Sequence, residues 1–152
     1  MSANLHDRDF YAWTQQQLTL LRTGDLSKID IKNLIDEVES MGASERKELI
    51  SRLEVLLAHL LKCQFQPKRR GRSWELTIQE QRSRLLDLLE ENPSLGNPEN
   101  LHASLAKAYK YGVIAAQKET KLSRNVFPSE CPYTLENVLD DEFIPVANNP
   151  VQ

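Results

Sequence analysis

The sequence predicts an all-α protein: an up-and-down antiparallel bundle of about five helices, followed by a mostly irregular C-terminal tail. Apolar residues recur every three or four positions along most of the chain, and no segment alternates with a period of two for long enough to predict a strand. Only five glycines occur among 152 residues, which disfavours a turn-rich β protein. The composition, 40% hydrophobic and 27% charged, is that of an ordinary globular domain. We therefore expect residues 1–152 to form a single domain.

The first two predicted helices have clear start signals. Asp7 or Asp9 can cap the first, which runs to about Arg22 before Gly24 ends it. Its broad apolar face comprises Phe10, Trp13, Leu18, Leu20 and Leu21. Asp30 is expected to cap the second helix, whose apolar stripe is Ile31, Leu34, Ile35, Val38 and Met41. Gly42 then predicts a break or bend.

The third predicted helix is the longest and extends from about Ser44 to Gln64. Its leucine-rich stripe is formed by Leu49, Leu53, Leu56, Leu60 and Cys63. Pro67 and Gly71 indicate a turn, after which Ser73 is expected to cap a fourth helix. The residues of that helix predicted to face the core are Trp74, Ile78, Leu85, Leu88 and Leu89.

The fifth predicted helix starts at Asn97 and Pro98 and reaches about Lys121. We expect it near the centre of the bundle, because small side chains on its buried side allow another backbone to approach closely: Ala103, Ala106, Ala108, Gly112, Ala115 and Ala116. Three prolines predict an extended tail from about residue 125, packed on the bundle and containing one short helix from about Thr134 to Asp140.

Composition also narrows the class of protein. No apolar run approaches the ~20 residues that span a bilayer, and the first residues lack the basic and apolar regions of a signal peptide. The only cysteines, Cys63 and Cys131, are too few for a disulfide scaffold or a thiolate zinc site. We expect a cytoplasmic protein with reduced thiols, no membrane contact, no metal and no cofactor.

Several polar residues occupy positions where the helical pattern favours apolar ones. Arg82 lies on the apolar stripe of the fourth helix, and a buried guanidinium needs a partner, for which Glu37 is the predicted carboxylate. One interpretation is a polar pocket between helices; the other is a structural ion pair or an arginine that reaches the surface. His59 is a candidate base, although no second metal ligand stands near it on its helix. The full candidate polar site is Glu37, Arg52, His59, Lys62 and Arg82.

A second candidate site is the cationic turn after the third helix. Residues 68–84 contain six cations against two acids, whereas residues 125–152 contain five acids and no Lys or Arg. The turn can bind a phosphate or a nucleic acid, or it can be a solvated turn whose tryptophan fills the core. The residues of this candidate anion or nucleic-acid patch are Lys68, Arg69, Arg70, Arg72 and Trp74.

Several motifs carry a resemblance to a known family. They are Asp9-Phe10-Tyr11-Ala12-Trp13, Leu34 to Gly42, His59-Leu60-Leu61-Lys62, Arg72-Ser73-Trp74, Glu119-Thr120 and Pro128-x-x-Cys131-Pro132-Tyr133. Through them nearly the whole chain resembles a bacterial family known as domain of unknown function 29. The resemblance implies a helical bundle, and it implies no substrate, cofactor or catalytic residue.

Three functions are compatible with the sequence. The first is a non-enzymatic helical interaction module that binds a protein partner or self-associates into a dimer, as the wide apolar faces of the first and third helices suggest. The second is a ligand-binding or catalytic bundle that uses Arg82, Glu37, His59 and Lys62. The third is an RNA-binding or RNA-cleaving domain, because Arg52 and His59 match the Arg-x6-His spacing and thereby resemble HEPN ribonucleases. Whether the protein is an enzyme stays open.

Overall fold

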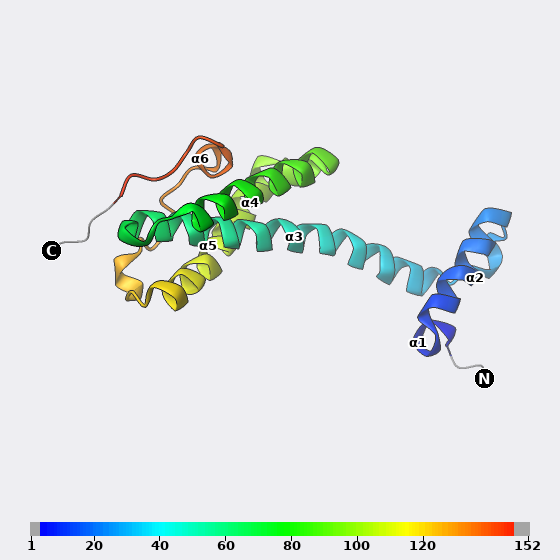
Figure 1. Cartoon of the computed structure of the whole chain (residues 1–152). Coiled ribbons are helices and arrows are strands. Elements are labelled where there is room, and N and C mark those ends of the chain that lie inside the picture. Colours follow the sequence, from blue (N-terminus) through cyan, green and yellow to red (C-terminus); the bar gives the residue numbers. More distant parts are fainter. Residues whose placement is uncertain (1–3, 148–152) are drawn as a thin grey trace. The chain divides into compact units, whose positions relative to one another are not determined.

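The computed structural model describes residues 4–147, and the regular structure in that range is helical, without a β-strand (Figure 1). The predicted all-α class is confirmed. The helices are α1 (Leu5–Arg8), α2 (Phe10–Thr23), α3 (Ile31–Phe65), α4 (Arg72–Glu91), α5 (Pro98–Thr120) and α6 (Leu135–Leu139). Short 3-10 helices lie at Leu26–Lys28, Pro67–Arg69, Pro93–Gly96 and Arg124–Val126.

The chain divides into two compact units, and the division falls between Ser44 and Glu45. We call them the N-terminal unit and the C-terminal unit. That the whole chain forms a single domain stays a prediction. No helix among residues 4–147 has both the length and the apolar character required to cross a membrane.

Local capping residues explain most helix boundaries. The Asp9 carboxylate accepts a hydrogen bond from the Ala12 amide and starts α2, which ends at Gly24 with φ 76°. Asp30 accepts from the Asn33 amide at the start of α3. Asn97 caps α5 as predicted. The predicted cap at Ser73 is wrong, because α4 begins at Arg72 and its N-cap position is Gly71, two residues before Ser73.

The predicted break at Gly42 is also wrong, since α3 runs through this residue without interruption. A glycine inside a helix costs only about 1 kcal/mol relative to alanine, and unlike proline it keeps its backbone hydrogen bond. The residues that follow Gly42 are mostly good helix formers, so this cost does not end the helix. Two predicted helices are therefore one.

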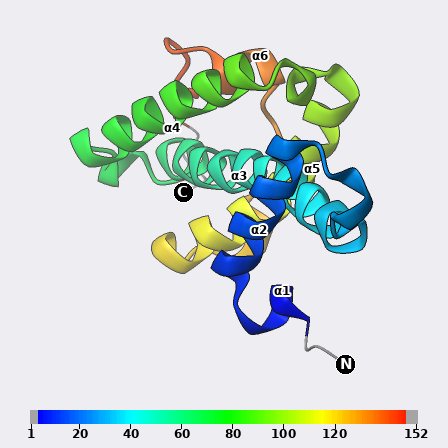
Figure 2. The ribbon, with the colours of Figure 1, turned by 90° about the vertical axis from the view of Figure 1, so that its right-hand side faces the viewer.

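In the C-terminal unit the core lies among the second half of α3, α4 and α5. The leucine stripe predicted for α3 is buried throughout, together with Ile78, Leu85 and Leu88 of α4. Figure 2 shows α4 and the last turns of α5 on opposite sides of α3. A Cβ atom built on Gly112 would lie 3.3 Å from the Glu54 carbonyl oxygen, so α5 approaches α3 closely there. Ala103 and Ala106 of the predicted small face are exposed instead.

The C-terminal tail is irregular apart from the short α6, and several of its apolar side chains are buried in the C-terminal unit. Phe127, Tyr133 and Val138 belong to the hydrophobic core. The Tyr133 hydroxyl donates to the side chain of Gln64 at 2.6 Å, and the Tyr109 hydroxyl donates to the carbonyl of Pro128 at 2.6 Å. These contacts hold the tail against α3 and α5.

The N-terminal unit has very little core. Polar contacts join its helices: the Trp13 indole donates to Asp30 at 3.0 Å, and the Gln17 amide oxygen accepts from the backbone amide of Asp30 at 2.7 Å. Trp13 and Gln17 are the only buried residues among positions 4–44. Of the five residues on the predicted apolar face of the first helix, therefore, only Trp13 is buried.

Candidate functional site

Arg82 is buried as the sequence pattern predicted, with 1% of its surface exposed, but its partners differ from the predicted carboxylate. Its Nε donates to the carbonyl of Val138 at 2.8 Å, and its Nη2 donates to the carbonyl of Asn137 at 3.2 Å. Both carbonyls belong to the last turn of α6: the Asn137 carbonyl also accepts from the Asp140 amide at 3.3 Å, and the helix dipole favours a cation at this end. Burial lowers the pKa of Arg82, and the nearby carboxylates of Asp140 and Asp141 oppose that shift. Arg82 thus joins α4 to the tail.

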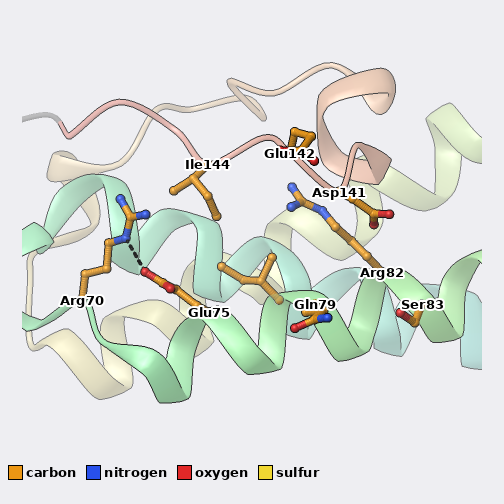
Figure 3. A pocket seen from close by; sticks show the side chains of 9 residues that line it. Arg70, Glu75, Gln79, Arg82, Ser83, Asp141, Glu142 and Ile144 are labelled. Carbon is orange, nitrogen blue, oxygen red and sulfur yellow. Dashed lines mark hydrogen bonds and ion pairs between the residues drawn. The ribbon is translucent and has the colours of Figure 1, made fainter.

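A cavity of about 490 Å³ lies beside Arg82, between α4 and the tail (Figure 3). The side chains around it are mostly polar and of both charges: Arg70, Glu75, Gln79, Arg82, Asp141 and Glu142. Arg70 of the predicted cationic turn and two acids of the tail, Asp141 and Glu142, thus line the same cavity. The ion pair of Arg70, however, is with Glu75 of the adjoining helix α4, at 3.2 Å.

Lys62 forms the most buried ionic cluster in the C-terminal unit. Its side chain is 1% exposed, and its ammonium donates to the Glu119 carboxylate, which is 58% exposed. The same ammonium lies 4.6 Å from the ring centroid of Trp74 and 3.4 Å from Nε2 of His59. The cluster therefore connects α3, α4 and α5 at one point. Lys62, Trp74 and Glu119 all belong to the motifs that carry the family resemblance.

The geometry around His59 fits a neutral imidazole. Its Nδ1 lies 2.9 Å from the carbonyl of Val55, an acceptor, so the proton belongs on Nδ1. Nε2 then carries the lone pair and can accept from the Lys62 ammonium. Burial lowers the pKa of His59, and the charge of Lys62 lowers it further. The lone pair that a general base would use is thus already directed at Lys62.

The remaining predicted polar residues have separate partners. In the C-terminal unit, Arg52 donates to the side chain of Gln81 at 3.3 Å and to Glu48 at 3.4 Å. In the N-terminal unit, Glu37 accepts from Nε2 of His6 at 2.8 Å. Of the five candidates, the structure brings only His59 and Lys62 into direct contact. Among residues 4–147 no group of three His, Cys, Asp or Glu side chains is arranged to hold a metal ion.

His6 and His59 should have pKa values on opposite sides of 6.5. Hydrogen bonds to Glu37 and Asp7 raise the pKa of His6, whereas burial lowers the pKa of His59. The contribution of His6 to stability is therefore complete below pH 6.5 and is lost as the pH rises through its folded pKa. For His59 the sign is reversed, because the fold favours the neutral ring and loses stability as the pH falls below 6.5. Nitrogen-detected NMR titration, with assignments from His6→Gln and His59→Gln, measures both midpoints; a His59 midpoint above that of His6 would contradict this prediction.

In the predicted anion patch, the cations are exposed to solvent, whereas the tryptophan is partly buried. Lys68, Arg69, Arg70 and Arg72 are exposed. Trp74 is partly buried and packs against the core. The Lys62 ammonium lies over its ring. Trp74 is therefore a packing residue of the core, and the four cations form the exposed part of the predicted patch.

Most of the exposed large apolar side chains of residues 4–147 belong to the N-terminal unit. Nine large apolar side chains there are between 38% and 73% exposed: Phe10, Tyr11, Leu18, Leu21, Leu26, Ile31, Ile35, Val38 and Met41. We call these nine residues the apolar surface of the N-terminal unit. Only six further large apolar residues are exposed in the rest of the described chain. The predicted apolar stripe of the second helix is thus real, but its residues are not in the core.

Part of this surface is concave. An apolar groove of about 320 Å³ is lined by Ile29, Ile31, Leu34, Ile35, Val38 and Glu39. Leu34 and Ile29 are partly buried, and Glu39 is the single charged residue of the groove. Isolated exposed apolar residues are common on proteins, whereas a grouped set with a groove is typical of an interaction site.

The family described as "Domain of unknown function DUF29" matches residues 5–144. The chain belongs to this family. No curated protein and no solved structure matches it. Because no function is assigned to the DUF29 family, membership implies no activity for this chain, and its function has to be inferred from the geometry described above.

Sequence reasoning missed two features of this DUF29 domain. The first is Glu119 as the partner of Lys62, although Glu119-Thr120 is one of the family motifs and was the available signal. The second is the groove on the first turns of α3, because an apolar stripe indicates that a helix face will be covered without indicating by what.

Proposed function

We propose that this DUF29 domain is a helical interaction module that binds another protein through the apolar surface of its N-terminal unit. The observation that carries the proposal is the exposure of nine large apolar side chains within 44 residues. Covering a large apolar side chain that is about half exposed contributes about 1 to 2 kcal/mol, so a partner that covers these side chains gains affinity. A soluble monomer rarely maintains a large apolar area without such a use.

The other two functions receive less support from the geometry. A catalytic or ligand-binding site of the predicted type requires its polar residues to converge, and of the five candidates only Arg82 lines the cavity beside α4. RNA binding by stacking requires an accessible tryptophan face, and one face of Trp74 is covered by Lys62. Of the four exposed cations, Arg70 is already paired with Glu75, and Lys68, Arg69 and Arg72 can still contact a phosphate backbone.

The proposal predicts that charges in the groove abolish partner binding without unfolding the protein. We expect Ile35→Glu combined with Val38→Glu to lose at least one protein that the wild-type chain recovers from cells, because a buried carboxylate without a partner opposes association. Quantitative mass spectrometry of affinity-purified complexes identifies that protein. Its purified form should then bind the variant at least about tenfold more weakly than wild type.

Leu76→Glu is the matched control, because Leu76 is 48% exposed on α4, outside the N-terminal unit. This variant should recover the same proteins as wild type. Circular dichroism should show the same helical content for all three proteins. If the groove variant and wild type recover the same proteins with the same affinities, and also have the same mass in solution, the proposed function is wrong.

A further inference from the structure

The N-terminal unit is too poor in core to be stable by itself. Chains of about 40 residues usually need a disulfide, a metal or oligomerisation in order to fold. Both cysteines of this protein lie outside the unit, and only Trp13 and Gln17 are buried within positions 4–44. Something else must therefore cover its apolar side chains.

The exposed area matches what a stable protein–protein interface requires. Nine large side chains, each roughly half exposed, leave on the order of 800 Å² of side-chain surface in water. A standard interface buries about 800 Å² on each partner. One such contact is therefore enough to cover the apolar surface of the N-terminal unit.

The unit contains both halves of a complementary contact. On α2, the exposed residues Phe10, Tyr11, Leu18 and Leu21 fall within about 100° around the helix and form a projecting stripe. On α3, the groove supplies a concave apolar strip of the same kind. A helix that places an apolar stripe in an apolar groove is a common recognition mode.

Charge also favours this pairing. Helix α2 contains no acid, and its single charged residue is Arg22, which lies at the edge of the stripe. The groove contains one charge, Glu39, and the adjoining exposed residue Asp36 is also acidic. An α2 helix can therefore approach the groove without opposing like charges, and Arg22 can meet a carboxylate at the rim.

We propose that the partner of this surface is a second copy of the chain, with α2 of each copy lying in the groove of the other. This inference rests on the proposed function, since it names the partner of the same surface. The arrangement is isologous: each copy gives one helix and receives one, so a twofold axis relates them and the contact closes as a dimer. Four helices then surround a shared core, which supplies the burial that the unit lacks alone.

The test is the mass of the full chain in solution. Light scattering after size exclusion, with sedimentation equilibrium at micromolar concentration, should give twice the 17.5 kDa of one chain. Leu18→Glu in the stripe and Val38→Glu in the groove should each raise the dissociation constant at least about thirtyfold, as for a central interface residue. Leu76→Glu, the control outside the N-terminal unit, should leave the mass unchanged.

Mixing the two interface variants tests the geometry. A Leu18→Glu chain has an intact groove, and a Val38→Glu chain has an intact stripe, so an equimolar mixture retains one of the two contacts. We expect dimers in the mixture at concentrations at which each variant alone is monomeric. A mixture that stays monomeric overturns the pairing of α2 with the groove, and a monomeric wild-type chain overturns the dimer.

The two proposals fail differently. If wild type is monomeric while the groove variants still weaken binding to another protein, the second copy is the wrong partner and the interaction module stands. If neither mass nor recovered proteins respond to charges in the groove, both proposals are wrong.

Discussion

Replacing Arg82 with lysine is expected to lower the free energy of unfolding by about 2 to 4 kcal/mol. The guanidinium donates from two nitrogens to the carbonyls of Val138 and Asn137 in the last turn of α6. A lysine keeps the charge, but its single ammonium cannot reproduce the planar fork that reaches both carbonyls. At least one of the two hydrogen bonds to α6 is then lost, and a buried charge is left with poorer hydrogen bonding. Urea denaturation measures the loss of stability.

The substitution should also loosen one specific segment. Because Arg82 binds α6, hydrogen exchange at the amides of Val138 and Asp140, which close the turns of this short helix, should accelerate more than exchange in α3. Arg84→Lys is the matched control on the same helix, since Arg84 is exposed and its Nε contacts only Glu80, at 2.9 Å. An exposed pair of this kind contributes about 0 to 1 kcal/mol. Equal effects of the two substitutions would show that the contact with α6 does not stabilise the fold.

Helical periodicity predicted those features of this fold that depend on one helix at a time. The stripe from Leu49 to Leu60 is buried because a spacing of three and four places those side chains on one face, whatever packs there. The caps at Asp9 and Asn97 follow from local hydrogen bonds and were predictable for the same reason. The continuity of α3 through Gly42 was not predicted, because the helix-propensity cost of one glycine is smaller than the combined helix propensity of its neighbours.

The partners of polar side chains were not predictable in this way. The sequence indicated that Arg82 is buried, yet its partners are backbone carbonyls, which every residue carries and which therefore leave no trace in residue type. Lys62 was predicted only as a member of a polar site, and it is buried in an ion pair because α5 supplies Glu119 and α4 supplies Trp74 at the same point. Such a convergence of three helices depends on how they pack, which periodicity does not specify.

The same limit explains the apolar surface of the N-terminal unit. The pattern of Ile31, Ile35 and Val38 predicted a covered helix face, and the structure leaves those side chains exposed within their own unit. Periodicity reports that a face is apolar; it does not distinguish coverage by the same chain from coverage by another. The candidate site was thus present in the sequence as a stripe, but it could not be identified as an interface.

Removing the acid of the buried ion pair is expected to destabilise the protein more than removing the base. In Glu119→Ala the Lys62 ammonium remains buried without its carboxylate, and we expect a loss of about 2 to 4 kcal/mol, near the lower end of the range for a fully buried pair because Glu119 is half exposed. In Lys62→Met the Glu119 carboxylate stays hydrated, while the methionine fills the same space against Trp74. Its stability should change by less than about 1.5 kcal/mol.

The asymmetry follows from which partner has access to water. Because Lys62 is 1% exposed and Glu119 is 58% exposed, only the glutamate can exchange the ion pair for hydrogen bonds to water. The double variant should therefore have the stability of Lys62→Met alone, since without the ammonium the carboxylate has little to contribute. Lys118→Met, an exposed neighbour of Glu119, controls for the loss of a cation near the end of α5. Thermal and urea unfolding of the four variants give these values, and a larger loss in Lys62→Met than in Glu119→Ala would mean that the ammonium itself stabilises the junction of α3, α4 and α5 through Trp74 and His59.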